Sequence, residues 1–351
     1  MTGVDKRSRA DAGEAAVTSW LRAELALAEP VSTAPISGGW SNITYLVTDG
    51  TGRRVVVRRP PTNDPRGGAH DVLREAEVVS ALRDTAVPVP VVVARCADLS
   101  VAGHPFYATE FVPGAVVRSA EVAAAVAPDD RRALGFALVD VLADLHAVDL
   151  DAVGLGPLRR RTPYLQRQLR RWTEQWRTTA TRELPAVDRV AERLAVALDG
   201  VDADRDVLIH GDFRFGNVMI EDVAAPRITA VLDWELATTG HPLADLGFLG
   251  ARIGAPPGVL EGDIDPSAVA GYPSFEELGQ RFAARTGVPI RDLPVFVALS
   301  AWRWAIIVEG IARRVSQGSM SGGMGGSAAE SAAWHRRRVE LLAGLAADLL
   351  G

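Results

Sequence analysis

The chain has 351 residues, of which 48% are apolar and 23% charged, and its formal net charge is −6. This length suffices for two compact units, and the composition is that of a soluble globular protein. The acidic balance gives no support for a nucleic-acid partner, because such partners favour a basic face. Cys96 is the only cysteine, which excludes an internal disulfide and a thiolate metal cluster and suits a reducing compartment.

The apolar segments give no indication of a membrane protein. The N-terminal segment has no apolar core of the kind that a signal peptide needs. Residues 293–314 form the most apolar long segment, but Arg303 and Glu309 interrupt it, which favours a buried core helix over a membrane span. We therefore expect a cytoplasmic protein without a membrane partner.

Lysine is almost absent, since Lys6 is the only one and nearly all positive charge is arginine. The phosphate-binding motif G-x-x-x-x-G-K-[ST] is absent as well. If the folded part of the chain binds phosphates, arginine must supply the charge.

The first third of the chain combines helical and strand-like periodicity. An amphipathic helix is predicted over about residues 12–28, and a second one over 70–84, after a Pro- and Gly-rich loop at 60–68. A hairpin turn is predicted at 49–52. The predicted strands cover residues 31–36, 43–48, 53–59, 87–96 and 104–112. Residues 31–112 should therefore form a small unit of about five strands and one helix.

After "PGA" at 113–115 the pattern becomes mostly helical, and strands are expected only within 206–233. The Gly/Ser-rich segment 318–330 is interpreted as a flexible loop, with a substrate lid as the alternative. The predicted helices cover residues 119–147, 162–198, 240–254, 274–286, 293–315 and 326–350. We accordingly predict two domains, residues 1–112 and residues 113–351.

The stretch "LIHGDFRFGNVMI" (208–220) places polar residues between two apolar runs. Asp212 and Asn217 lie five positions apart in what should be a short loop between rigid strands, where functional groups tend to sit. A second apolar run, "RITAVLDWE", ends in Asp233, sixteen positions beyond Asn217. An acid at the end of a buried strand is well placed to hold a metal.

These residue types match the needs of phosphoryl transfer, in which positioning and charge neutralisation dominate. Asp212 is the candidate that orients an acceptor hydroxyl and takes its proton. Asn217 and Asp233 offer the hard oxygen ligands that Mg²⁺ prefers. Arg58 would bind phosphates, with Glu75 on the following helix holding it in place. Each residue alone also fits a turn, a cap or a solvated surface, so the hypothesis rests on their joint order.

Together, "LIHGDFRFGNVMI" and "VLDWELATTGHPLADLGFL" resemble the aminoglycoside phosphotransferase-like kinase family, over about residues 31–315. The segments "GGWSNITYLV", "VVVRRPP" and "REAEVVSAL" are similar to the branch found alone or fused to acyl-CoA dehydrogenases. The resemblance implies an α+β, bilobal protein-kinase-like fold. Its N-lobe (1–112) would hold a small antiparallel sheet and the hinge, and its C-lobe (113–351) would be mostly helical.

The resemblance also implies a role for each matching residue. Asp212 would be the catalytic aspartate, and Asn217 and Asp233 would bind Mg²⁺. Arg58 stands where many kinases have lysine, and Glu75 stands where its ion-pair partner belongs. The remaining implied positions are a glycine loop that approaches the ATP phosphates through backbone N–H groups (Ser37, Gly38, Gly39, Ser41 and Asn42), an adenine hinge at 109–112 (with Glu110 and Val112), and two supporting residues (His210 and Asp245).

Two departures from the kinase pattern accompany the resemblance, namely the missing lysine and the incomplete G-x-G-x-x-G loop. The missing lysine leaves open the alternative that the chain is a non-catalytic, nucleotide-binding module on the same fold. The expected activity is a Mg-ATP-dependent phosphotransferase that acts on a hydroxyl of a small molecule.

The acceptor is defined least by the sequence. The candidate pocket residues are Glu235, Trp302, Arg303, Glu309 and Arg314. If they line a pocket, an anionic or partly apolar acceptor is favoured, such as a hydroxy acid or a hydroxyacyl-CoA. Alternatively, the tryptophans belong to the core and the arginines to the surface. An aminoglycoside O-phosphotransferase, conferring antibiotic resistance, would instead use acids such as those in "LEGDIDP" (260–266). The choice between ATP and GTP and the oligomeric state stay open.

Overall fold

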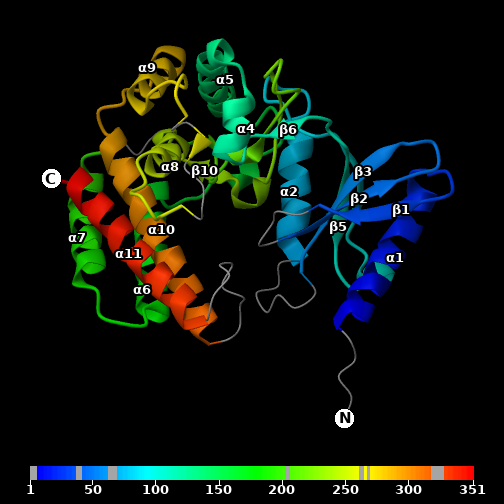
Figure 1. Cartoon of the computed structure of the whole chain (residues 1–351), viewed down its shortest axis with the longest axis horizontal. Coiled ribbons are helices and arrows are strands. Elements are labelled where there is room, and N and C mark those ends of the chain that lie inside the picture. Colours follow the sequence, from blue (N-terminus) through cyan, green and yellow to red (C-terminus); the bar gives the residue numbers. More distant parts are fainter. Residues whose placement is uncertain are drawn as a thin grey trace. The chain divides into compact units, whose positions relative to one another are not determined.

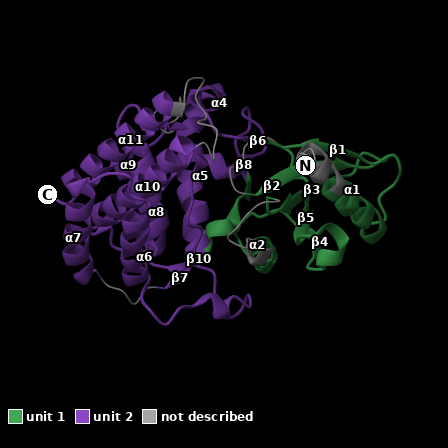
Figure 2. Cartoon of the chain, turned by 90° about the horizontal axis from the view of Figure 1, so that it is seen from below, with its two compact units in different colours: residues 1–114, 229–237 green, residues 115–228, 238–351 purple. Residues whose placement is uncertain are grey.

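The structure is a computed structural model, and Figure 1 shows the whole chain. It describes residues 6–36, 42–61, 69–201, 206–260, 265–266, 269–317 and 328–351. The chain divides into two compact units, shown in Figure 2: unit 1 comprises 1–114 and 229–237, and unit 2 comprises 115–228 and 238–351. Residues 229–237, which the sequence-based division placed in the second domain, therefore count with unit 1.

Unit 1 contains an antiparallel sheet of five strands in the order β1-β2-β3-β5-β4. The pattern of alternating apolar residues predicted these five strands. Strand β4 is shorter than expected because Pro88 and Pro90, in the predicted segment, have no N–H for a ladder. The strands are β1 (Ser32–Pro35), β2 (Ile43–Thr48), β3 (Arg54–Arg59), β4 (Val92–Cys96) and β5 (Phe106–Glu110).

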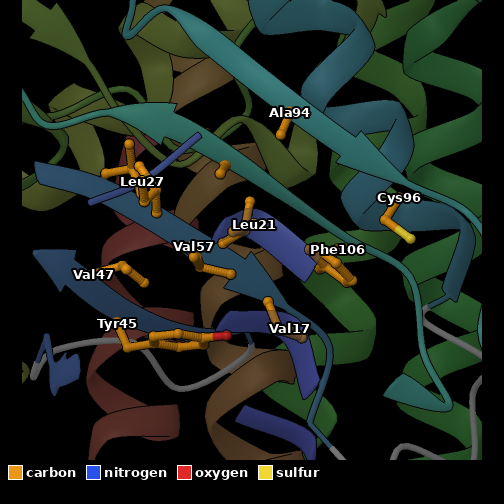
Figure 3. Packing of buried hydrophobic residues seen from close by; sticks show 11 residues of the cluster. Val17, Leu21, Leu27, Tyr45, Val47, Val57, Ala94, Cys96 and Phe106 are labelled. Atoms are coloured by element: carbon orange, nitrogen blue, oxygen red, sulfur yellow. The ribbon is translucent and has the colours of Figure 1, made fainter. Parts of the chain in front are cut away.

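Helix α1 (Lys6–Glu24) covers one face of this sheet. Figure 3 shows its Val17 and Leu21 packed with Val57 of β3 and Phe106 of β5 in one apolar cluster. The helix ends earlier than predicted, and Ala26 adopts a left-handed conformation with φ 50°. Because side chains alternate along a strand, the neighbours of Val57 point to the opposite face.

Helix α2 (Ala69–Ala81) covers that opposite face. Its Val72 and Ala76 pack against Tyr107 of β5. Glu75 lies at the same helical spacing as these apolar residues and therefore shares the buried side of the helix. A short helix, α3 (Leu99–Ala102), was not predicted.

The segment 229–237 is attached to unit 1 by hydrogen bonds. It includes most of β9 (Ile228–Val231) and the 3₁₀ turn η3 (Trp234–Leu236). The amide of Val231 donates to the carbonyl oxygen of Pro88 over 2.7 Å, and the Arg74 guanidinium donates to the carbonyl oxygen of Ala237. Asp233 is therefore carried by the same unit as the sheet.

Unit 2 is mostly helical. The predicted helices 119–147 and 162–198 are each split in two, because Pro128 and Pro185 start new helices at the position that proline favours. The other four helices lie within three residues of their predicted bounds. The helices are α4 (Ala120–Ala125), α5 (Pro128–His146), α6 (Tyr164–Thr179), α7 (Pro185–Asp199), α8 (Leu243–Ile253), α9 (Phe275–Thr286), α10 (Leu293–Ser316) and α11 (Ala328–Leu349), with a 3₁₀ turn η1 (Gly156–Leu158).

Helix α10 forms the core of unit 2 and packs against α6, α7, α8 and α11; Figure 1 shows it beside α11. By length and composition it is the one described helix apolar enough to cross a membrane, but 72% of its apolar window is buried inside the structure. It is therefore the buried core helix that its charged residues predicted.

Short strands frame the loop of unit 2 that carries Asp212 and Asn217. Strand β7 (Val207–Ile209) enters the loop and pairs with β10 (Thr238–Gly240). The turn η2 (Phe215–Asn217) and strand β8 (Val218–Ile220) follow the loop, and β8 pairs with β6 (Ala115–Val116). Strands β6 and β10 were not predicted, since two or three residues are too few to show a period.

Candidate active site

The backbone around Asp212 is fixed by a buried carboxylate. Gly211 adopts φ 87°, a conformation that glycine tolerates best. Asp245, in the first turn of α8, accepts hydrogen bonds from the amide of His210 over 2.8 Å and from that of Gly211 over 2.7 Å. The predicted supporting residue Asp245 thus holds the two residues that precede Asp212.

Asp245 is fully buried, yet it stays charged. Burial by itself raises the pKa of a carboxyl group, but the hydrogen bond and charge of His146 and the Gly211 amide outweigh it and lower the pKa of Asp245. The Nε2 atom of His146 lies 3.4 Å from the carboxylate. His146, the last residue of α5, was missed by the sequence analysis.

His210 contacts the backbone of the same loop. Its side chain is fully buried, and its Nδ1 accepts a hydrogen bond from the amide of Asp212 over 3.2 Å. His210 therefore contacts the backbone of Asp212, the contact expected of a supporting residue. Its functional role stays a prediction.

Asp212 and Asn217, which the sequence predicted to act together, are in contact. The amide nitrogen of Asn217 donates to the backbone oxygen of Asp212 over 2.8 Å and to its carboxylate Oδ2 over 2.7 Å. The bond to Oδ2 fixes the carboxylate. Both bonds use the amide nitrogen of Asn217, so neither engages its amide oxygen, which can ligate a cation. Phe213 and Phe215 lie within this loop, and their buried side chains anchor it.

A charge cluster occupies the α2 face of the sheet in unit 1; it consists of Arg58, Glu75, Asp233 and Glu235. The guanidinium of Arg58 lies 3.2 Å from the carboxylate of Glu75, 2.9 Å from that of Asp233 and 3.9 Å from that of Glu235. The pairing of Arg58 with Glu75 was expected. Its contact with Asp233, 175 positions away in the sequence, was not.

Burial and charge act against each other in this cluster. The Glu75 side chain is 1% exposed, and burial raises the pKa of Glu75 to about 7, against the lowering effect of Arg58. Burial lowers the pKa of a guanidinium, but the charges of Glu75 and Asp233 outweigh it and raise the pKa of Arg58. Arg58 is therefore always cationic, and three carboxylates converge on it.

Asp233 fits the demands of a magnesium ligand. It adopts a left-handed conformation (φ 66°, ψ 61°), a strained state that tends to occur at functional sites. Arg58 contacts its Oδ1, and within the described chain no hydrogen bond engages Oδ2. No group of three His, Cys, Asp or Glu side chains in the described ranges could hold a metal by itself. Carboxylate and amide oxygens nevertheless suit Mg²⁺ where phosphates and water complete its shell.

The other predicted nucleotide-binding residues are only partly described. Ser37, Gly38, Gly39 and Ser41 lie outside the described residues. Asn42 donates to the carboxylate of Glu235 over 3.1 Å, so Glu235, predicted for the acceptor pocket, contacts residues predicted to bind nucleotide. In the hinge, Glu110 pairs with Arg53 over 2.7 Å, and its amide donates to the carbonyl oxygen of Val91. For Val112, no backbone hydrogen bond is found within the described segments.

The predicted acceptor residues of α10 have different environments. Trp302 is fully buried and donates through its indole to the carbonyl oxygen of Val187 over 3.0 Å, and Glu309 is buried and accepts from Thr181. The position of Trp302 matches the alternative that places the tryptophans in the core. Arg303 is partly exposed and contacts the Tyr164 hydroxyl over 3.3 Å, while Arg314 is exposed. Of the acids in 260–266, Glu261 and Asp263 lie outside the described residues, as does most of 318–330.

The sequence profile of the phosphotransferase enzyme family matches residues 32–278. The chain is 37% identical over 297 residues to acyl-CoA dehydrogenase family member 11 of Gallus gallus, an alignment that covers 83% of the chain and 38% of that relative. A second relative, family member 10 of Mus musculus, is 33% identical over 296 residues, with 83% and 27% covered. The chain thus spans less than two fifths of the length of these curated relatives.

Solved structures show the same fold. A chain from Ralstonia eutropha JMP134, provisionally assigned as an aminoglycoside phosphotransferase, superposes with a TM-score of 0.79 at 33% identity, covering 95% of this chain and 98% of that one. The aminoglycoside phosphotransferase APH(4)-Ia, in complex with ADP and hygromycin B, superposes with a TM-score of 0.58 at 17% identity, covering 94% and 98%.

The fold is therefore the α+β, kinase-like fold of aminoglycoside phosphotransferases, as the sequence predicted. The chain belongs to the phosphotransferase enzyme family.

Proposed function

We propose that this chain is a Mg-ATP-dependent phosphotransferase that transfers the terminal phosphoryl group to a hydroxyl of a small, anionic acceptor. The observation that carries this proposal is the fixed position of Asp212. Asn217 donates one hydrogen bond to its carboxylate and one to its backbone oxygen, and His210 accepts a hydrogen bond from its amide. Asp245 holds the amides of the two preceding residues. A general base must be held in one position to orient a hydroxyl.

In the proposed reaction the acceptor hydroxyl donates a hydrogen bond to the carboxylate of Asp212. The hydroxyl oxygen forms a bond to phosphorus as the bond from phosphorus to the leaving nucleoside diphosphate breaks, and the hydroxyl proton passes to Asp212. An ordinary carboxylate suffices, because the transition state is loose and the proton moves late. Asn217 and Asp233 would hold Mg²⁺, which when bound neutralises charge on the phosphates.

Arg58 takes the place of the usual lysine in this proposal. Its contacts with Glu75 and Asp233 give it the fixed position that a phosphate-binding cation requires. A guanidinium can also bind phosphate oxygens bidentately. The absence of lysine is therefore weak support for a non-catalytic module.

We infer an anionic acceptor, rather than a polycationic one, from cationic and aromatic side chains of α6 and α10. Arg167 donates to the carbonyl oxygen of Thr239 over 3.0 Å, and Thr239 pairs with Leu208 just before the loop. Close to Arg167, the hydroxyl of Tyr164 accepts from Arg303, which also lies over the ring of Trp172. These helices thus contribute cationic and aromatic groups, which suit the carboxylate of a hydroxy acid or the phosphates of a hydroxyacyl-CoA.

The test is transfer of labelled phosphate from ATP to a panel of hydroxy acids, hydroxyacyl thioesters and aminoglycosides. We expect turnover with the anionic acceptors that disappears in Asp212→Ala, while that variant still binds nucleotide. Nucleotide binding without turnover on any acceptor would support the non-catalytic module. Turnover on aminoglycosides alone, together with raised tolerance in expressing cells, would support the resistance enzyme.

A further inference from the structure

The loop between β7 and β8 contains a cation with no assigned role, Arg214. Its backbone is extended, with φ −167° and ψ 166°. Side chains two positions apart on an extended segment point to the same side. Phe213 and Phe215 point into the core, so Asp212 and Arg214 share the opposite, partly exposed side, where they are 22% and 28% exposed.

The guanidinium of Arg214 contacts the proposed catalytic carboxylate. Its Nε lies 3.3 Å and 3.4 Å from the two carboxylate oxygens of Asp212. Within the described chain, no hydrogen bond engages its two terminal nitrogens, which can therefore donate to another group.

Gly216 provides the space for this guanidinium. A Cβ atom added at Gly216 would overlap Nη1 of Arg214 and lie 3.0 Å from its Cζ. The glycine thus permits the guanidinium to lie flat against the loop, next to Asp212. A larger residue at 216 would have to displace it.

The neighbouring arginine, Arg252, is engaged elsewhere. It lies 3.5 Å from Asp265 and over the ring of Trp304. Burial, followed by the positive charge of Arg214, lowers the pKa of Arg252. Arg214 is therefore more exposed and less engaged than Arg252.

The geometry points to Arg214 as a catalytic residue that binds the terminal phosphoryl group of the nucleotide during transfer. This assignment rests on the proposed function. A hydroxyl that donates to Asp212 lies about 3 Å from it, and the phosphorus it attacks lies about 3–3.5 Å further. A guanidinium that already touches the carboxylate can reach oxygens at that distance. Arg214 makes no covalent bond and transfers no proton; it neutralises charge on the phosphoryl oxygens.

Binding measurements test this assignment without a known acceptor. The affinities of the full chain for Mg-ADP and for a non-hydrolysable Mg-ATP analogue are compared by calorimetry. In Arg214→Met, affinity for the ATP analogue should fall about tenfold, because one charge-assisted hydrogen bond is lost. Affinity for ADP, which lacks the terminal phosphate, should stay within about twofold. Arg227→Met, which removes an exposed arginine paired with Glu221, is the matched control and should change neither.

Gly216→Ala supplies an independent variant that keeps the charge. It should weaken binding of the ATP analogue in the wild-type background and have no further effect in Arg214→Met. Thermal unfolding of each variant checks that the loop is folded. A Gly216→Ala effect that persists at full size in Arg214→Met would overturn the assignment.

Other outcomes separate the alternatives. If Arg214 only positions Asp212, Arg214→Met will leave the discrimination between ATP and ADP unchanged, which overturns the assignment. A wild-type chain that binds neither nucleotide would overturn the proposed function itself and this assignment with it. For the turnover number with any active acceptor, we expect a loss of about 10²-fold in Arg214→Met and partial recovery in Arg214→Lys.

Discussion

The two units hold their carboxylates in different ways. In the charge cluster of unit 1, Glu75, Asp233 and Glu235 surround one guanidinium, and charge is balanced mainly by charge. In the loop of unit 2, Asp245 and Asp212 are held mainly by hydrogen bonds from backbone amides and from a side-chain amide.

This difference has consequences for substitution. Coulomb attraction depends weakly on direction, so an ion-pair cluster tolerates exchange of one cation for another of similar reach. Hydrogen bonds require a donor or acceptor at one place. Loss of a charge should therefore disturb the cluster most. Loss of a hydrogen-bonding group should disturb the loop most.

The largest effect is expected from Asp245→Ala. This change removes the acceptor of two buried amides and the partner of His146, which should lower the free energy of unfolding by about 3–5 kcal/mol. Urea unfolding measures this loss of stability. Activity should also fall, because the loop that carries Asp212 loses its fixed conformation. A loss below about 1 kcal/mol would mean that the Asp245 contacts are unimportant.

Substitutions of Arg58 distinguish most directly between a need for positive charge and a need for one side-chain geometry. Arg58→Met should weaken ATP affinity by about 10–10³-fold, because three carboxylates lose their cation. Arg58→Lys should stay within about tenfold of the wild type, since the cluster needs positive charge more than a guanidinium. Calorimetric titration with Mg-ATP measures both. Equal losses in the two variants would show that the cluster depends on guanidinium geometry.

The pH dependence of stability tests how strongly the loop of unit 2 depends on the charged form of Asp245. The folded-state pKa of Asp245 is lowered from its usual value of 3.8, so its contribution is present above that value and is lost as the pH falls through the folded pKa. Between pH 5 and pH 3 the wild type should lose stability more steeply than Asp245→Asn, which cannot titrate there. Parallel stability curves for the two proteins would contradict this expectation.

The smallest effect concerns a helix cap remote from both sites in the sequence. Ser274 and Glu277 form a capping box at the start of α9. Ser274→Ala should lower the free energy of unfolding by about 1 kcal/mol and leave nucleotide affinity unchanged. Thermal unfolding and the same titration check this pair of results, and a change in affinity would show that stability and binding are coupled.

The sequence by itself determined the elements and much of the candidate residue set. Strand alternation predicted the five strands of unit 1, and helical spacing predicted α2 with Glu75 on its buried side. The paired stretches around Asp212 and Asp233 identified the family, because their order and spacing are specific. Arg214 was visible as a basic residue between two phenylalanines, but its partner could not be predicted from the sequence.

Only the tertiary structure decided which of these groups meet. Arg58 contacts Asp233 from 175 positions away, and His146 reaches Asp245 from the end of another helix. The tertiary structure also decided that Trp302 and Glu309 are buried and that residues 229–237 belong with unit 1. Local periodicity reports which face of an element is buried, but the partner on that face is set by how distant segments pack, which no short window of sequence contains.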